Sequence, residues 1–378
     1  MARDNGVNSR RLALEALVRV ETSGAFVNLA LPHILQRSEL SKPDRAFVTN
    51  MVYGTVRMQR ACDYLIDQFR RGDVEPIAQA ALRVGTYQLK WLNTPPHAAI
   101  DTTVSAVPKR CRSVVNAILR RISELDLTMV AYPSLAMELS YPDWVVDSIT
   151  TMLGPDEAEL ALRAMNQDAT TVTRSDGYRQ DLASQLVTEV VDANDGHLVV
   201  DLCAAPGGKA TGLAALGATV IAGDKRPKRA KLVAKNARRL GYEVPTVMAD
   251  ATAPPIRAGV ADRVLVDAPC SGLGSLKRRP DARWNIDEAA PARLSKLQTD
   301  MVLAGVELLR PGGELTYSVC TLTREETVDV LARVREQLPV DVTVMEPEVT
   351  PWAEIEGVSV LTPDETDAIA VFRLRRDR

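Results

Sequence analysis

The first 128 residues carry apolar side chains at the three- and four-residue spacing of helices with one buried face. Two serines, Ser9 and Ser113, stand where helix caps are expected. The apolar positions that follow them are Leu14, Leu17 and Val18, then Val115, Ile118, Leu119 and Ile122. Helix breakers interrupt the pattern at Gly24, Pro43, Gly72 and Pro95-Pro96. The pattern predicts an all-helical domain over residues 1–128, with the apolar stripes as its core.

From residue 191 onward, short apolar runs alternate with helical patterns. The expected strands are 197–203, 219–224, 244–250, 263–269 and 314–320, and the expected helices are 208–216, 227–240 and 294–309. This alternation is typical of a parallel sheet with helices on both faces. Residues 191–378 are therefore predicted to form an α/β domain. Residues 129–190 are interrupted by prolines, and we expect an irregular or small α/β connecting region with a helix near 156–165.

Composition and charge narrow the class of protein. The chain is 46% hydrophobic and 25% charged over 378 residues, as in ordinary globular proteins. We find no apolar run near the roughly 18 to 20 residues of a membrane span and no signal core, so we expect a cytoplasmic protein without a membrane partner. Residues 1–128 carry a net charge of +6 and residues 129–378 one of −9. The basic half suits an anionic partner such as nucleic acid, although a solvated helical surface explains it equally well.

The cysteines argue against metal and disulfide chemistry. They stand at 62, 111, 203, 270 and 320, form no C-x-x-C pair and are accompanied by three histidines. Neither a structural zinc site nor a disulfide framework is expected from that spacing. Cys62 and Cys111 fall in amphipathic patterns and are expected to fill space in the core.

Polar residues gather where the predicted strands end, which is where parallel sheets bind ligands. The motif DLCAAPGGK at 201–209 turns from a strand into a helix, and its glycines allow a ligand close to the backbone. It is neither GxGxxG nor GxxxxGK[ST], which disfavours dinucleotide and P-loop binding. Asp224 and Asp250 end the next two strands, where they could accept hydrogen bonds from ribose hydroxyls and from an adenine amino group. Together these features predict a nucleoside pocket.

Five motifs carry a family resemblance: DLCAAPGGK, DAPCSGLG (267–274), RRPDARW (278–284), LSKLQ (294–298) and LLRPGGELTYSVCT (308–321). With them the chain resembles the Sun/Nop family of RNA cytosine-5 methyltransferases. Two further segments, DRAFVTNMVYGTVR (44–57) and VVNAILRRI (114–122), are similar to the NusB-like domain of the bacterial 16S ribosomal RNA members. The resemblance implies a Rossmann-like class I S-adenosylmethionine methyltransferase domain over 191–378. An all-α NusB-like RNA-binding domain over 1–128 precedes it, and we expect a monomer.

The resemblance also implies roles for the two late cysteines. C5 of cytosine is a poor nucleophile until a thiolate adds to C6, so covalent catalysis splits one hard step into two. In the family, Cys320 is the nucleophile and Cys270 assists breakdown of the adduct. The residues alone do not decide which of the two cysteines is the nucleophile, because in DNA cytosine-5 enzymes the Pro-Cys thiol attacks instead.

Further residues are expected around the cysteines. We hypothesise that Asp267 hydrogen-bonds N3 or the amino group of the cytosine, and that Lys209 pairs with Asp267; a plain salt bridge fits Lys209 equally well. The expected cofactor-binding residues are Cys203, Ala204, Ala205, Pro206, Gly207, Gly208, Lys209, Asp224, Arg229, Asp250 and Asp267.

RNA contacts are expected from the segment after Cys270. Phosphate contacts are predicted for Lys277, Arg278, Arg279 and Arg283, and stacking on a base for Trp284. We interpret Arg226, Lys228, Arg229 and Lys231 as a solvated helix start, although Arg229 could also reach the cofactor. Three functions remain in play: methylation of 16S ribosomal RNA, methylation of transfer RNA, and a non-catalytic role in RNA-binding assembly or antitermination. The intact cysteines, Asp267 and Lys209 argue against the last.

Overall fold

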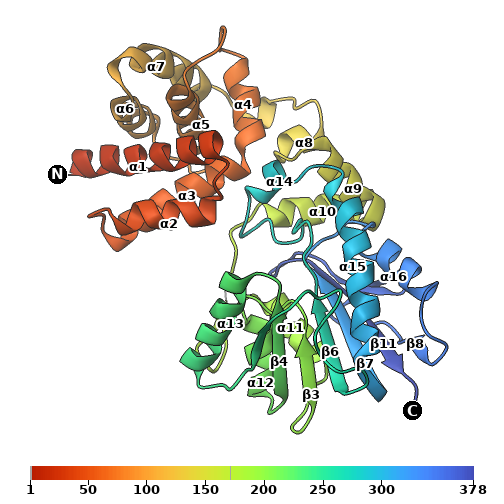
Figure 1. Cartoon of the computed structure of the whole chain (residues 1–378). Helices are drawn as coiled ribbons and strands as arrows, with labels where there is room; N and C mark the ends of the chain where they lie inside the picture. Colours follow the sequence, from red (N-terminus) through yellow and green to blue (C-terminus); the bar gives the residue numbers. More distant parts are fainter. Residues whose placement is uncertain (1, 171) are drawn as a thin grey trace. The chain divides into compact units, whose positions relative to one another are not determined.

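The computed structural model describes residues 2–170 and 172–378 and divides the chain into two compact units (Figure 1). The first unit runs to Val146 and also contains Arg279–Asn285. The second unit contains Asp147–Arg278 and Ile286–Arg378. The boundaries that we expect at residues 128 and 190 stay a prediction. Among the described helices, none combines the length and apolarity needed to cross a membrane.

The first unit is helical. Its elements are α1 (Ala2–Ser23), α2 (Val27–Gln36), α3 (Lys42–Arg57), α4 (Gln59–Asp67), α5 (Pro76–Lys90), α6 (Pro96–Ala106), α7 (Lys109–Ser123), the 3-10 turn η1 (Leu127–Met129), α8 (Leu135–Glu138) and α14 (Ala282–Asn285). Helix α9 (Asp143–Leu153) continues into the second unit. The thiols of Cys62 and Cys111 are buried in the helical core, as predicted.

Two predicted helix caps were wrong. Ser9 lies buried inside α1, and Ser113 lies inside α7, which begins at Lys109 after Pro108. The side chain of Ser41 caps α3 by accepting a hydrogen bond from the N–H group of Asp44. Proline, whose missing N–H is tolerated in the first turn, is the first residue of α5 and α6.

The second unit is a mixed sheet with helices on both faces. Its strands are β1 (Val172–Thr173), β2 (Arg179–Gln180), β3 (Leu198–Asp201), β4 (Thr219–Asp224), β5 (Thr246–Met248), β6 (Ala261–Asp267), β7 (Leu309–Val319), β8 (Val342–Val344), β9 (Ala353–Ile355), β10 (Val358–Leu361) and β11 (Ile369–Arg376). Its further helices are α10 (Pro155–Met165), α11 (Leu182–Val190), α12 (Gly208–Ala215), α13 (Pro227–Leu240), α15 (Ala290–Glu307) and α16 (Val328–Arg335). Prolines in the connecting region start helices: Pro155 is the first residue of α10.

The order of strands in the large sheet is β5-β4-β3-β6-β7-β11-β10-β9, with β8 paired to β11. Strands β3 to β7 are parallel, as predicted, but β8 to β11 pair antiparallel, which the expected parallel sheet did not include. Glu356 and Gly357 connect β9 to β10, and both have positive φ, as a two-residue hairpin turn requires. The order reverses between β3 and β6, so a ligand crevice is expected at the carboxyl ends of these two strands.

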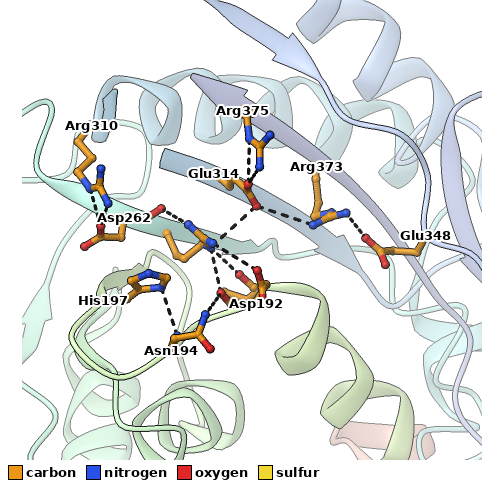
Figure 2. A network of polar contacts seen from close by, with 11 residues as sticks. Asp192, Asn194, His197, Asp262, Arg310, Glu314, Glu348, Arg373 and Arg375 are labelled. Atoms are coloured by element: carbon orange, nitrogen blue, oxygen red, sulfur yellow. Dashed lines mark hydrogen bonds and ion pairs between the residues drawn. The ribbon is translucent and has the colours of Figure 1, made fainter. Parts of the chain in front are cut away.

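A network of ion pairs lies at the end of the sheet opposite the carboxyl ends of β3 and β6 (Figure 2). Glu314 of β7 is buried and pairs with Arg375, with Arg373 at 3.8 Å and with Arg263 at 3.9 Å. Asp262, the second residue of β6, pairs with Arg310 and accepts the N–H of Leu198 at 2.8 Å. Because these groups stand near the starts of β6 and β7, the network fixes the sheet at the end away from Asp201 and Asp267.

Candidate active site

Lys209 and Asp267 form an ion pair across the point where the strand order reverses. Lys209 lies in the first turn of α12 after β3, and Asp267 ends β6. The Lys209 Nζ lies 2.7 Å from Asp267 Oδ2, and Ser318 Oγ donates to Asp267 Oδ1 at 2.6 Å. Burial acts to lower the pKa of Lys209, but the charge of Asp267 outweighs it, so the pKa is raised. The predicted pair is therefore confirmed, and it places a cation inside the site.

The two late cysteines lie side by side, with their Sγ atoms 3.3 Å apart. Cys320 follows the last residue of β7, and Cys270 lies in the loop after β6. The hydrogen bond from the Cys270 thiol lowers the pKa of Cys320; burial and Asp267 oppose this effect, and Lys209 supports it. The same hydrogen bond, together with burial, raises the pKa of Cys270 well above its ordinary value. Either thiol can donate in this hydrogen bond, and the lowered pKa of Cys320 favours Cys320 as the thiolate and Cys270 as the donor.

Gly274 allows the segments that carry the thiols to pack closely. Its N–H donates to the carbonyl oxygen of Cys320 at 2.9 Å, and its own carbonyl accepts the N–H of Ala368 at 2.9 Å. A Cβ atom at this position would lie 2.3 Å from the Ala368 oxygen and 2.9 Å from the Cys320 carbonyl carbon. These are backbone atoms, so the position accepts glycine and excludes larger residues without a shift of the loop.

A buried glutamate that sequence reasoning missed holds the Cys270 loop. Glu326 is 0% exposed, and its Oε1 accepts the N–H of Ser271 at 2.9 Å and the amide of Gln298 at 3.0 Å. Its Oε2 accepts the hydroxyl groups of Ser271 and Thr323. Because Ser271 follows Cys270 directly, these bonds fix the position of the thiol. The sequence pattern contains no signal that separates Glu326 from its neighbour Glu325.

The predicted cofactor loop packs against α13. Gly207 has φ +104°, and a Cβ atom there would lie 3.3 Å from the Cα of Val233. Arg229 donates from Nη2 to the carbonyl of Ala205 at 2.9 Å, and Asn236 donates from Nδ2 to the carbonyl of Pro206 at 2.8 Å. The loop backbone is therefore fixed by side chains of a neighbouring helix.

Arg174, which sequence reasoning also missed, supports the start of α12. It donates from Nη1 to the Gly208 carbonyl at 2.5 Å and from Nη2 to Thr211 Oγ1 at 3.0 Å. An ion pair with Asp176 at 2.5 Å keeps the guanidinium in place. Arg174 lies just after β1, in a segment without a regular pattern, so the sequence offers no cue for this contact.

The two acids predicted for the nucleoside lie at the ends of neighbouring strands. Asp224 is buried, pairs with Arg229 at 3.0 Å and accepts the N–H of Arg226 at 2.8 Å. Asp250 pairs with Lys225 at 2.6 Å, and this hydrogen bond is the first cause that lowers the pKa of Asp250 to about 2. Their roles toward a ribose and an adenine stay a prediction.

Asp201 has the property that a bound ammonium group requires. It is fully buried; its Oδ1 accepts the N–H of half-buried Cys203 at 3.3 Å, and its Oδ2 has no hydrogen-bond partner among the residues that the structure describes. Burial first, and the charge of Asp267 second, raise the pKa of Asp201 to about 8. An orphaned carboxyl oxygen beside an open loop fits the amino group of S-adenosylmethionine.

Most of the residues expected to contact RNA phosphates are used inside the fold. Lys277 is buried and donates to the Asp364 carbonyl, and Arg278 pairs with Asp181 and Asp367. Arg283 is 0% exposed, with its guanidinium 3.9 Å above the centre of the Tyr141 ring, and the indole N–H of Trp284 donates to the carbonyl of Val56 at 2.8 Å. The predicted phosphate contacts of the buried Lys277 and Arg283 were therefore wrong, whereas the RNA roles of the half-buried Arg278 and Trp284 stay predictions. Arg279 remains exposed.

The thiol pair predicts a pH dependence. The Cys320 thiolate forms as pH rises through its pKa, so alkylation of Cys320 by iodoacetamide should rise to a plateau with a midpoint below pH 9. In Cys270→Ala the hydrogen bond that lowers this pKa is lost, and the midpoint should move to higher pH. Mass spectrometry of the labelled peptide measures both curves. A midpoint that stays in place would contradict the assigned hydrogen bond.

Comparisons with known proteins agree with this geometry. Residues 188–366 match the family model described as 16S rRNA methyltransferase RsmB/F, and residues 7–124 match the NusB family. The chain is 33% identical to a Mycobacterium tuberculosis protein named as a methyltransferase, over 88% of this chain and 87% of that protein. It is 32% identical to the ribosomal RNA small subunit methyltransferase B of Thermus thermophilus, over 84% of both chains.

The solved structures show the same fold. The crystal structure of the protein PH0851 covers 98% of this chain and 99% of its own, with a TM-score of 0.77 at 23% identity. The fold prediction, a helical NusB-family domain followed by a Rossmann-like methyltransferase domain, is confirmed. The chain therefore belongs to the RsmB/F family and is an RNA methyltransferase that depends on S-adenosylmethionine.

Proposed function

We propose that this protein methylates C5 of a cytosine in 16S ribosomal RNA through a covalent bond between Cys320 and C6 of the base. The observation that carries the proposal is the thiol pair: Cys320 has a lowered pKa, and its Sγ lies 3.3 Å from that of Cys270. The Lys209–Asp267 pair beside it supplies charge where a cytosine ring would need stabilisation.

The proposed reaction begins with addition of the Cys320 thiolate to C6. The electrons of the C5–C6 double bond then make C5 nucleophilic, and C5 takes the methyl group from the sulfonium of S-adenosylmethionine, which becomes a neutral thioether. Asp267 would accept a hydrogen bond from the amino group of the ring as a carboxylate, or, once protonated, donate one to N3, where negative charge develops. The C5 proton then leaves as the C6–S bond breaks and the aromatic ring re-forms.

Cys270 is suited to the second half of this reaction. Its pKa is raised first by the hydrogen bond to Cys320, then by burial. Once Cys320 is bonded to the base, it is no longer a thiolate, and the largest cause of the raised pKa disappears. Cys270 then becomes more acidic at the moment when a base is needed to accept the C5 proton. The pair thus exchanges roles between the two halves of the reaction.

The choice of 16S ribosomal RNA rests on the family. The matched family model is described by that substrate, and the Thermus thermophilus relative is named for the small ribosomal subunit. The NusB-family match over residues 7–124 supports an RNA partner but does not distinguish between RNAs.

The experiment that tests the proposal incubates the protein with tritium-labelled S-adenosylmethionine and either 16S ribosomal RNA or total transfer RNA. We expect label in 16S ribosomal RNA, recovered as 5-methylcytidine after nuclease digestion. Label confined to transfer RNA would move the substrate to the second candidate. Label recovered in another nucleoside would overturn the cytosine chemistry. Binding of S-adenosylmethionine without transfer to either RNA would favour the non-catalytic role.

A further inference from the structure

Helix α13 carries a stripe of basic side chains on its solvent face. The four members, which we call the α13 stripe, are exposed and are Lys228, Lys231, Lys235 and Arg238. Their spacing of three, four and three residues places them in one row along the helix. The face toward the sheet buries Ala230, Val233 and Ala237. In Figure 1, α13 is drawn in green and lies beside β4.

The α13 stripe is an island of positive charge in an acidic part of the chain. Residues 225–239 contain eight lysines or arginines and no aspartate or glutamate. The remainder of residues 129–378 contains 20 lysines or arginines and 37 aspartates or glutamates. If these charges served only to keep the protein soluble, we would expect the same balance of basic and acidic residues as in the rest of residues 129–378. The local excess of basic residues therefore needs another cause.

The α13 stripe works against the stability of its own helix. Like charges three and four residues apart repel, and Lys228 and Lys231 stand near the helix N-terminus, where cations oppose the macrodipole. The first turn contains no acidic residue. The nearby acids Asp224 and Asp250 pair with Arg229 and Lys225, and no ion pair within the described part of the chain involves the stripe. Arg238 is in the last turn, where the macrodipole favours a cation, but folding does not explain the other three residues of the stripe.

We propose that the α13 stripe is a contact surface for the sugar–phosphate backbone of the RNA substrate. Phosphates would supply the counter-charges that the fold leaves out, over a row about 15 Å long at 1.5 Å rise per residue. Such contacts position an RNA without reading its sequence. The proposal rests on the proposed function, and it replaces our interpretation of Lys228 and Lys231 as a solvated helix start.

The contacts of α13 with the predicted cofactor loop would place a bound RNA relative to the cofactor. Arg229 and Asn236 bind the carbonyls of Ala205 and Pro206 in the predicted cofactor loop. An RNA backbone held on the solvent side of α13 is thereby fixed relative to the methyl donor. Helix α13 exposes one large apolar side chain among its described residues, that of Leu232. This is too little apolar surface for insertion into a membrane.

The test compares two double variants of the full chain with the same change in charge. Lys231→Gln/Lys235→Gln removes the middle of the stripe. Arg257→Gln/Arg378→Gln is the matched control, because both residues are exposed. Arg257 precedes the start of β6, and Arg378 lies beside Gly312 of β7, so both are at the end of the sheet away from Asp201 and Asp267. Fluorescence anisotropy with a labelled single-stranded RNA of mixed sequence gives Kd at several salt concentrations.

We expect the stripe variant to bind RNA roughly 10-fold more weakly and its plot of log K against log salt to be shallower by about 1.4, at about 0.7 per lost phosphate contact. The control should match the wild type. The stripe variant should also keep or slightly raise the wild-type Tm, which separates a binding role from a structural one. An unchanged Kd and salt slope would overturn the proposal.

Methylation assays separate this proposal from the proposed function. If the wild type methylates RNA and the stripe variant keeps the wild-type KM and salt slope, the stripe proposal fails and the proposed function stands. If the wild type methylates no RNA, the proposed function fails, and the salt slopes still decide whether the stripe binds RNA. If the stripe variant no longer floats with phosphatidylserine vesicles as the wild type does, but binds RNA with unchanged affinity, the stripe is a membrane-binding surface. That result would also overturn the proposal.

Discussion

Replacing Cys320 by alanine is expected to lower methyl transfer to RNA by at least about 10⁴-fold, because the nucleophile that activates C5 is removed. Single-turnover transfer of the tritiated methyl group measures the loss. Binding of S-adenosylmethionine, followed by calorimetry, should change little, because Cys320 is not among the predicted cofactor residues. The same loss is expected for Cys320→Ser, whose hydroxyl has the shape but not the acidity of the thiol.

Cys111→Ala is the matched control. Cys111 is a buried thiol in the core of the helical unit, and burial raises its pKa, so it is not poised to ionise. We expect this variant to retain most of the transfer rate. A Cys320→Ala protein with more than a tenth of the wild-type rate would contradict the covalent role of Cys320.

Replacing Glu326 by alanine is expected to lower the free energy of unfolding by about 3–5 kcal/mol, because buried donors on Ser271, Gln298 and Thr323 lose their acceptor. The Cys270 loop should also lose its fixed position, and a displacement of about 1 Å costs about 100-fold in rate. Urea denaturation measures the first effect. Single-turnover transfer, at a temperature where the variant is folded, measures the second.

The neighbouring Glu325→Ala variant is the control for Glu326→Ala. Both changes remove one carboxyl group from the same loop, but among the described residues Glu325 accepts from Arg333 through its backbone carbonyl and not through its side chain. Glu326→Gln, which keeps one acceptor oxygen, should lie between the two. Equal stability of the two alanine variants would show that the Glu326 hydrogen bonds do not hold the loop.

The parts of the site that the sequence predicts share one property: they stand at the carboxyl ends of parallel strands. Lys209 follows β3 and Asp267 ends β6, and these strands are neighbours in the sheet. Their pairing thus follows from strand order once the α/β pattern is recognised. The thiols meet for the same reason, since Cys270 follows β6 and Cys320 follows β7, its next neighbour.

The parts that the sequence did not predict depend on tertiary contacts. Glu326 and Arg174 are ordinary charged residues in irregular segments, and their hydrogen bonds to Ser271 and Gly208 join positions far apart in the chain. Arg283 looks like a phosphate ligand by composition, yet it is buried against Tyr141. A local pattern reports residue type and period, but not which charged side chain another segment covers.

The central claim is that Cys320 forms the bond to RNA and Cys270 releases it. The most direct measurement incubates Cys270→Ala and Cys320→Ala separately with S-adenosylmethionine and 16S ribosomal RNA and separates the products on a denaturing gel. The account predicts a protein–RNA band that resists denaturation for Cys270→Ala, and neither that band nor methylated RNA for Cys320→Ala. A denaturation-resistant band from Cys320→Ala, with none from Cys270→Ala, would contradict it and exchange the two roles.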